Sequence, residues 1–547
     1  MATSLLSAQG GGREESIIIV RERTTLAGGL RSLTQDPGPH CAAKGLGVGV
    51  NEPHIRLRYS MAVNYLARLY RIAVAVGFAI IVARRLNVEE FGLWGVVLST
   101  SAMLSSATAL WRFWAPRFIA RGWREAAATC LALSLLYCAV GSTIYVALSY
   151  AEWLLLGWGL SYMLMGLPIF VLCVVNDGLE GVVSAVKPEA VGYRTFIYET
   201  LRIALALALV RAMNLGLLGA VVSVEVPLAL AALYMALIAV RQGLLPQRPS
   251  RSLASQWLRA GYVPLMNMTY NFLVGGVRAF ASWLTRSEVV VAYLNVGLAA
   301  QAPLSQLSRA SSLALYARLL RRPSPRDVAE TLRMYFAASG FVAVTLIALS
   351  RSVASVFNPE YYTGAYLVVA LVAIYSWVSG LANVYSTAVL GASDVDRQGI
   401  ASHGAIVRSP LFTTQLARVL GSAAAYAISA ALILCVPSGC LEQAAYVCLA
   451  LLLASTATLI YMRRRARALL PHRVPRREAL AAAAASAAAL SYYLLTGAHV
   501  LIVRNFWVSA PVLLAHVTVA ATIYLGVLLA CSSWARAMLR ESLLKVL

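Results

Sequence analysis

The chain has 547 residues, of which 60% are hydrophobic and only 13% are charged, and its formal net charge is +23. A soluble protein carries about 25% charged residues, so a water-soluble globular protein is excluded for most of the chain. The basic residues lie between apolar runs, as in the cytoplasmic rims of membrane proteins, which argues against a nucleic-acid partner.

Residues 1–60 are polar and rich in glycine. Their only apolar cluster, Ile17–Val20, is too short for the core of a signal peptide. We interpret this segment either as a disordered cytoplasmic N-terminal tail or as an upstream extension before a true start at Met61. The sequence is compatible with both interpretations.

Apolar runs of about 20 residues follow, each long enough to cross a bilayer. These runs must be helices, because backbone groups in lipid have to be satisfied within their own segment, and they lack the alternation of barrel strands. We therefore predict an all-α integral membrane protein with about 14 transmembrane helices. The predicted spans are 63–83, 93–113, 127–148, 153–175, 190–211, 214–240, 260–282, 289–314, 334–356, 362–388, 405–435, 441–462, 479–497 and 506–531.

The distribution of basic residues predicts the orientation of these spans. With both termini in the cytoplasm, the loops and tail assigned to the cytoplasm hold 27 basic residues, whereas the loops assigned outside hold 6. Cytoplasmic loops carry such an excess of lysine and arginine. We expect a multi-pass protein of the cytoplasmic membrane with both termini cytoplasmic.

Polar side chains repeat on single faces of several predicted helices. Arg68 and Arg71 follow Asn64 at helical spacing in span one, and Arg278 shares a face with Asn271 in span seven. Spans two and eight carry matching Ser/Thr-rich stripes, so two six-helix lobes related by a pseudo-two-fold axis are indicated. The predicted domains are a lobe over 61–240, a cytoplasmic linker over 241–259, a lobe over 260–462, a basic cytoplasmic loop over 463–478, and two further helices with a short tail over 479–547.

Arginines occur within the predicted spans, where each costs about 2.5–3.5 kcal/mol on insertion scales. They are Arg68, Arg71, Arg202, Arg278, Arg309 and Arg418. The acids that we identify in the spans are Glu199, three residues before Arg202, and Glu225, beside Pro227. This surplus of positive charge predicts a wet cavity that holds an anion, above all a phosphate or diphosphate, which guanidinium groups bind bidentately.

These arguments give a set of candidate site residues. The predicted substrate-binding residues are Arg68, Arg71, Arg278, Arg309 and Arg418, and the candidates for ion coupling are Glu225 and Glu199. Simpler alternatives stay open. Arg68 and Arg71 can reach the cytoplasmic rim, Arg202 can be a structural partner of Glu199, Glu225 can belong to a buried pair, and the Ser/Thr stripes can serve close helix packing.

The sequence predicts no metal site, cofactor or catalytic residue. The cysteines show no metal-ligand spacing, and most lie in or beside apolar runs, as small buried hydrophobic residues do. Cys435 and Cys440 flank a loop assigned outside, where a disulfide is an open alternative. Because no nucleotide-binding loop occurs, we expect an ion gradient or the membrane potential, not ATP, to supply the energy.

Two segments resemble those of a known family. Arg84–Trp94 is similar to the basic-Leu-Gly-x-Glu-Glu-Phe-Gly-Leu-aromatic run after the first helix of the polysaccharide-export flippases. Phe357–Tyr361, followed by a long apolar helix and Val389–Ala392, resembles the loop before that family's tenth helix and the end of that helix. Asn87 and Asn358 stand where glycine is usual. The resemblance extends over residues 62–465.

These flippases of lipid-linked oligosaccharides, of the O-antigen type, belong to the multidrug/oligosaccharidyl-lipid/polysaccharide exporter superfamily. The resemblance implies two lobes around a cationic cavity. It also implies alternating access that moves a polyprenyl-(di)phosphate-linked glycan from the cytoplasmic to the outer leaflet. The implied partners are the lipid-linked glycan and membrane lipids, with a monomeric chain that associates with glycan-assembly enzymes.

Two other functions remain as alternatives. A multidrug or toxic-compound exporter of the same superfamily needs an acidic cavity for cationic drugs, whereas the predicted cavity is basic. A polyprenyl-dependent glycosyltransferase or polymerase that binds metal needs paired acids on a substantial outer loop. Here the loop at Arg84–Gly92 offers only the adjacent Glu89 and Glu90. We therefore expect a transporter and not an enzyme.

Overall fold

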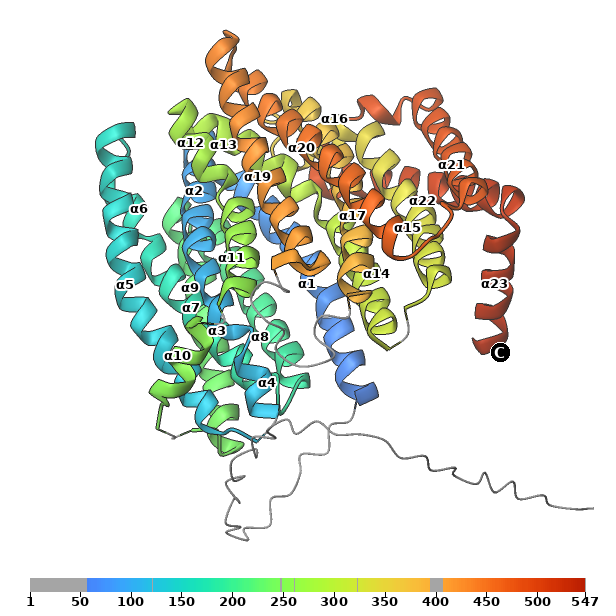
Figure 1. Ribbon diagram of the computed structural model, residues 1–547. Coiled ribbons are helices and arrows are strands. Elements are labelled where there is room, and N and C mark those ends of the chain that lie inside the picture. The colour runs from blue at the N-terminus through green and yellow to red at the C-terminus, as the bar shows by residue number, and fades with distance from the viewer. Residues whose placement is uncertain are drawn as a thin grey trace, which may run out of the picture. The chain divides into compact units, whose positions relative to one another are not determined.

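The computed structural model describes residues 57–120, 122–245, 248–259, 261–321, 323–393 and 407–546. All regular structure in these ranges is helical (Figure 1). Residues 1–56, most of the predicted tail, lie outside the described residues. Helix α1 begins at Leu57, so its first turn precedes Met61 and belongs to the segment that the sequence assigned to the tail.

The helices of the first half follow the first six predicted spans. In chain order they are α1 (Leu57–Arg85), α2 (Val88–Ser105), η1 (Ser106–Thr108), α3 (Ala109–Arg112), α4 (Ala115–Ala120), α5 (Glu125–Leu156), α6 (Leu160–Leu164), α7 (Gly166–Val183), α8 (Glu189–Leu205), η2 (Ala206–Ala212) and α9 (Gly216–Arg241). A short amphipathic helix, α10 (Arg251–Arg259), lies in the predicted linker.

The second half begins at α11. Its helices are α11 (Tyr262–Gly275), α12 (Val277–Thr285), α13 (Glu288–Ala300), α14 (Ala302–Arg321), α15 (Pro325–Ala348), α16 (Ser350–Phe357), η3 (Thr363–Ala365), α17 (Tyr366–Gly391), α19 (Pro410–Cys435), α20 (Cys440–Leu469), α21 (Arg476–Leu495), η4 (Ala498–Val500), α22 (Phe506–Cys531) and α23 (Ser533–Val546). The predicted basic loop over 463–478 is thus largely helical, because α20 continues to Leu469 and α21 begins at Arg476.

Among the described residues, 11 helical segments are long and apolar enough to cross a membrane, and they match 11 of the predicted spans. The other three predicted spans are interrupted helices. Span 190–211 ends in the π-helix η2, span 260–282 breaks at Gly276, and span 289–314 breaks at Gln301. Broken helices at membrane depth are tolerated where the freed backbone faces protein or a wet cavity.

Local sequence explains several helix starts. Pro168, Pro264 and Pro303 lie in the first turns of α7, α11 and α14, where a missing N–H removes no intrahelical bond. Asn87 caps α2: its side chain accepts a hydrogen bond from the Glu90 amide, and the Glu90 side chain accepts one from the Asn87 amide. Asparagine therefore has a capping function at this position.

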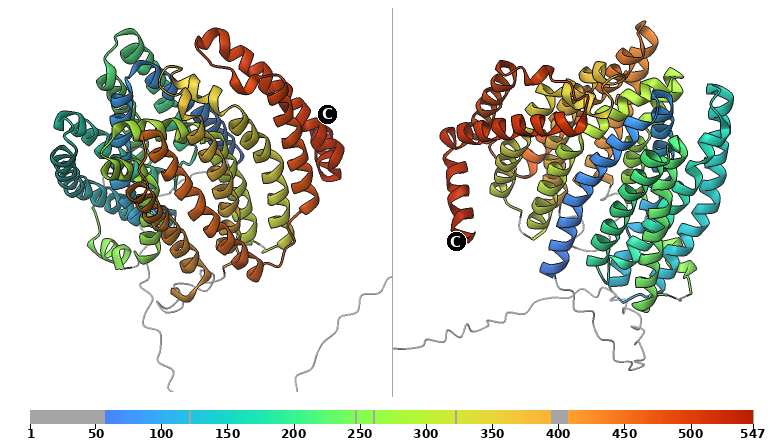
Figure 2. Two further views of the ribbon diagram at one scale, coloured as in Figure 1. Left: turned by 90° about the horizontal axis from the view of Figure 1, so that it is seen from above. Right: turned by 180° about the vertical axis from the view of Figure 1, so that it is seen from behind.

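The helices of each half of the chain pack on one another, and the all-helical architecture with its 11 membrane-length segments among the described residues confirms the predicted fold class. Within 57–241, α8 packs on α1 and α9, and α7 packs on α5 and α9. Within 262–469, α17 packs on α14 and α20, and α19 packs on α20. The last pair, α21 and α22, lies at one edge, with α21 against α15 (red in Figure 2). The domain boundaries given above stay a prediction.

Candidate functional site

Two adjoining cavities lie between the helices. The smaller, of about 360 Å³, is lined by Arg68, Arg71, Gln306, Arg309, Ser312 and Asn383, and we call it the triad cavity after its three arginines. The larger, of about 570 Å³, is enclosed mainly by α11, α14, α17, α19 and α20, and we call it the C-terminal cavity. Arg309 and Asn383 line both cavities, so the two spaces share a wall.

The five predicted substrate-binding arginines all line these cavities. Arg68 and Arg71 line the triad cavity, Arg278 and Arg418 line the C-terminal cavity, and Arg309 lines both. No described lining residue is aspartate or glutamate. The structure thus brings together residues from four helices that are distant in sequence and leaves their positive charge uncompensated by the lining.

Arg278 and Arg418 differ in how they are held. Arg278 follows the break between α11 and α12, and its buried Nε has no hydrogen-bond partner. No carboxylate of the described residues pairs with Arg278. Arg418 lies over the ring of Tyr270, 3.9 Å from its centroid, and its Nη1 donates to Oε1 of Gln415 at 3.3 Å. The ring contact and the hydrogen bond fix the guanidinium plane of Arg418 at the cavity wall.

Glu199, on α8, pairs both with Arg202 on the same helix and with Arg71 of the triad cavity. Its Oε2 lies 2.7 Å from Nη2 of Arg202, and its Oε1 lies 3.5 Å from Nε of Arg71. The Glu199 side chain is 1% exposed, whereas that of Arg71 is 61% exposed. Arg202 also lies over the ring of Phe78, at 4.7 Å, and lines neither cavity. Arg202 therefore holds Glu199, while Arg71 remains open to the cavity.

Glu225, the other candidate for ion coupling, is half-buried on α9 and lines neither cavity. It lies two residues before Pro227 in the interior of α9. The structure therefore brings only one of the two candidate carboxylates, Glu199, to the site.

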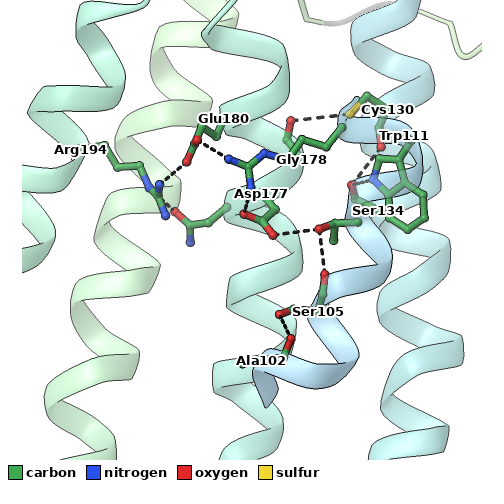
Figure 3. Close-up of polar contacts among 12 residues, drawn as sticks. Ala102, Ser105, Trp111, Cys130, Ser134, Asp177, Gly178, Glu180 and Arg194 are labelled. Atoms are coloured by element: carbon green, nitrogen blue, oxygen red, sulfur yellow. Dashed lines mark hydrogen bonds and ion pairs between the residues drawn. The ribbon is translucent and has the colours of Figure 1, made fainter. Parts of the chain in front are cut away.

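The expectation that the membrane helices supply few acids is wrong. Asp177 and Glu180 lie on α7, which continues to Val183, whereas the predicted span stopped at residue 175. Nη1 of Arg112 lies 2.7 Å from Oδ1 of Asp177, and its Nη2 pairs with Glu180. Glu180 also pairs with Arg194 at 2.6 Å, as Figure 3 shows. This cluster is neutral, lines neither cavity, and holds α3, α7 and α8 together.

The two polar stripes have different environments. In span two, Ser101 donates to the Gly166 carbonyl oxygen at 3.1 Å, which is a close helix contact of the kind that the simpler alternative described. In span eight, Ser308 and Ser312 accept from Nδ2 of Asn383 at 3.2 and 3.0 Å. These three side chains lie at the cavity walls and offer hydroxyl and amide groups there.

The two groups of helices close against each other beyond one end of the cavities. There α2 packs on α13, and Nδ2 of Asn295 donates to the Phe91 carbonyl oxygen at 2.8 Å. A Cβ atom at Gly92 would lie 2.0 Å from the backbone oxygen of Glu288, so only glycine permits this approach. We call this contact between α2 and α13 the outer closure, because it lies at the helix ends that the charge distribution predicts to be outside.

Three more side-chain hydrogen bonds join the two halves of the chain at the same end of the molecule, two from tryptophans and one from an arginine. Nε1 of Trp158 donates to Glu288 at 3.0 Å, and Nε1 of Trp283 donates to Glu152 at 2.8 Å. Nε of Arg84 donates to the Val356 carbonyl oxygen at 2.7 Å. Each bond joins the first half of the chain to the second, so these bonds hold the two halves together at this end.

The described residues hold neither a cluster of metal ligands nor a disulfide between Cys435 and Cys440. No group of three or more His, Cys, Asp or Glu side chains is placed to hold a metal ion. Cys435 and Cys440 are both free thiols, so the disulfide left open by the sequence is not formed in the structure. Cys435 is exposed and Cys440 is half-buried.

Solved structures of two kinds of membrane protein resemble this fold. An inward-facing multidrug resistance MATE family transporter of the MOP superfamily matches with a TM-score of 0.57 at 12% identity, over 74% of this chain and 98% of that chain. The lipid II flippase MurJ, in an inward closed conformation, matches with a TM-score of 0.57 at 11% identity, over 88% and 100%. No family model and no curated protein matches the sequence. The chain therefore has the multi-pass membrane fold that these two proteins share.

Proposed function

We propose that this protein is a flippase that moves a polyprenyl-(di)phosphate-linked glycan across the cytoplasmic membrane by alternating access. The observation that carries the proposal is the lining of the cavities, which contains five arginines and no described acid. Guanidinium groups bind phosphate oxygens bidentately and keep their charge at membrane depth. The lipid tail remains in the bilayer while the charged and hydroxylated headgroup crosses inside the protein.

A multidrug exporter is the second candidate, because the MATE transporter resembles the fold as well as MurJ does. The cavity chemistry favours the flippase, since a cationic drug would be repelled by unpaired arginines. The share of this chain that each match covers also supports the flippase. Helices α1 to α20 make up roughly three quarters of the chain, which is close to the 74% of this chain that the MATE match covers. The MurJ match covers 88% of this chain, which is more than these helices alone.

We propose that the two lobes, over 61–240 and 260–462, rock about the cavities. We infer that, with the outer closure formed, the cavities open toward the side on which α1 begins. Positive-inside counting makes this side the cytoplasm, where lipid-linked glycans would enter. Opening the contact between α2 and α13, with closure at the opposite end, would release the headgroup outside.

Glu199 is our candidate for the coupling carboxylate. It shares Arg71 with the cavity, so an anion that binds Arg71 competes with Glu199 for the same guanidinium. A proton on Glu199 would release Arg71 to the substrate, and loss of that proton would restore the pair. We expect Glu199→Gln to make export insensitive to the pH gradient, whereas Glu225→Gln should leave the gradient dependence intact. Equal effects of both substitutions would contradict this assignment.

The direct test uses cells that lack the native gene and carry variants of the full chain. Lipid-linked intermediates are extracted and quantified by mass spectrometry. Arg309→Ala should reduce export at least tenfold, because a charge-assisted contact is worth about 1.5–3 kcal/mol, and Arg309→Lys should restore part of it. Exposed Arg464 on α20 is the control, and Arg464→Ala should be neutral. Wild-type export by an Arg278→Ala, Arg309→Ala double variant would refute the proposal.

A further inference from the structure

The cavities divide the arginines into two groups, and the division bears on the substrate. Arg68 and Arg71 reach only the triad cavity, Arg278 and Arg418 reach only the C-terminal cavity, and Arg309 stands between them. The C-terminal cavity is the larger of the two, about 570 Å³ against about 360 Å³. A headgroup that fills both spaces therefore meets positive charge twice along its length.

The triad cavity by itself matches a diphosphate. A diphosphate that links a lipid to a sugar carries two negative charges. Among the described residues, no carboxylate pairs with Arg68 or Arg309, while Arg71 is shared with Glu199 at 3.5 Å. Two uncompensated guanidinium groups and one shared group thus balance the diphosphate without help from Arg278 or Arg418.

Arg278 is then an additional cation with no assigned anion. Its Nε is buried without a hydrogen-bond partner, and leaving a charged group in this condition is costly in a protein interior. Arg418 stands at the same cavity with its orientation fixed by Tyr270. An anionic ligand group beside Arg278 would satisfy its free Nε donor.

The remaining wall of the C-terminal cavity is suited to a sugar. Asn271, Gln301, Ser305 and Ser379 provide amide and hydroxyl groups that can exchange hydrogen bonds with sugar hydroxyls. Ser376 already donates to Oε1 of Gln301 at 2.7 Å, which orients that amide. The anionic group expected beside Arg278 would accordingly belong to a sugar residue.

We infer that the transported glycan is acidic, with a sugar carboxylate, as in a uronic acid, that pairs with Arg278 while the diphosphate occupies the triad cavity. This inference rests on the proposed function and specifies its substrate class. A carboxylate fits the planar donor pair of a guanidinium. A phosphorylated sugar would offer related chemistry, so the experiment has to distinguish the two.

The first experiment identifies the substrate in cells that lack the gene. The lipid-linked intermediates that accumulate are analysed by mass spectrometry before and after carbodiimide coupling, which modifies carboxylates, and after phosphatase treatment. We expect a diphosphate-linked glycan that reacts with the carbodiimide. A neutral glycan, or one whose only acidic substituent is a phosphate, would overturn the inference and leave the proposed function intact. If no lipid-linked glycan accumulates, both are refuted.

The second experiment separates the two anion sites in the purified full-length protein, with inorganic pyrophosphate as the probe. Arg309→Gln should weaken pyrophosphate binding at least tenfold, whereas Arg278→Gln should change it less than twofold and still reduce export in cells about tenfold. Arg278→Lys should recover part of that export. If Arg278→Gln weakens pyrophosphate binding as strongly as Arg309→Gln does, Arg278 belongs to the diphosphate site and the inference is overturned.

Discussion

At the scale of single residues, the arginines inside this bundle are of two kinds. Arg112, Arg194 and Arg202 pair with carboxylates on neighbouring turns or helices. Arg278 has no such partner among the described residues and faces a cavity. Paired arginines stabilise the fold because their removal leaves a carboxylate uncompensated, whereas an unpaired arginine costs stability that only a ligand can return.

Stability measurements should separate these two kinds. We expect Arg278→Gln to leave the thermal unfolding midpoint of the detergent-purified chain unchanged or raised. Arg112→Gln should lower the free energy of unfolding by roughly 1–3 kcal/mol, because Asp177 and Glu180 lose their shared partner. This is below the value for a fully buried pair, since the Arg112 side chain is 37% exposed. Equal destabilisation by the two substitutions would make Arg278 a structural residue.

The sequence analysis identified the arginines that line the cavities but missed Asp177 and Glu180. These two acids pair with Arg112 and Arg194. Arg68, Arg71 and Arg278 were visible because they share helix faces with asparagines inside apolar runs. Asp177 and Glu180 end such a run, so hydropathy alone places them in a loop, although α7 continues through both. Their three-residue spacing places both on one helix face, and this is the signal that could have indicated them.

At the scale of elements, continuous helices were easier to predict than broken ones. Apolar length fixes where a helix crosses, and first-turn prolines such as Pro303 indicate where one restarts. The π-helix η2 carries no comparable local signal. It is followed by Asn214 and Gly216, both at positive φ (53° and 54°), so the chain reverses sharply before α9. Such a turn depends on packing as much as on local sequence.

The orientation of the elements can be tested with a native cysteine. Exposed Cys435 ends α19 on the side assigned outside, so an impermeant maleimide should label it in intact cells. In a background with Cys435→Ser and Cys440→Ser, an Arg465→Cys variant should stay unlabelled until the membrane is permeabilised. Arg465 lies on the exposed, basic end of α20, which charge counting places in the cytoplasm. Labelling of Arg465→Cys in intact cells would invert the topology.

At the scale of the whole molecule, helix order and number follow from hydropathy, but the conformation does not. The outer closure depends on contacts between α2 and α13, which are about 200 residues apart in sequence. Nothing in the local pattern of Gly92 or Gly95 shows that each faces the other half of the chain. In the structure a Cβ at Gly95 would lie 2.2 Å from Nδ2 of Asn295, so both glycines permit the lobes to meet.

The proposed alternating access requires that this closure open and re-form, and Gly92 allows a direct test. A Cβ at this position would lie 2.0 Å from the Glu288 backbone oxygen, which cannot move aside as a flexible side chain can. We therefore expect Gly92→Ala to disfavour the closed form, to expose the cavities to the outside, and to reduce export at least tenfold. The control is Gly526→Ala, because a Cβ at Gly526 meets no atom within 4 Å.

The conformational part of this prediction is read from a cysteine at cavity-lining Gln301, in a background with Cys435→Ser and Cys440→Ser. With Gly92 intact, Gln301→Cys should resist an impermeant maleimide in intact cells, because we propose that the outer closure blocks the cavity from outside. With Gly92→Ala it should become labelled, and with Gly526→Ala it should stay protected. If Gly92→Ala stops export while Gln301→Cys remains protected, the contact between α2 and α13 is not the gate. The exit for the headgroup would then lie elsewhere between the two lobes.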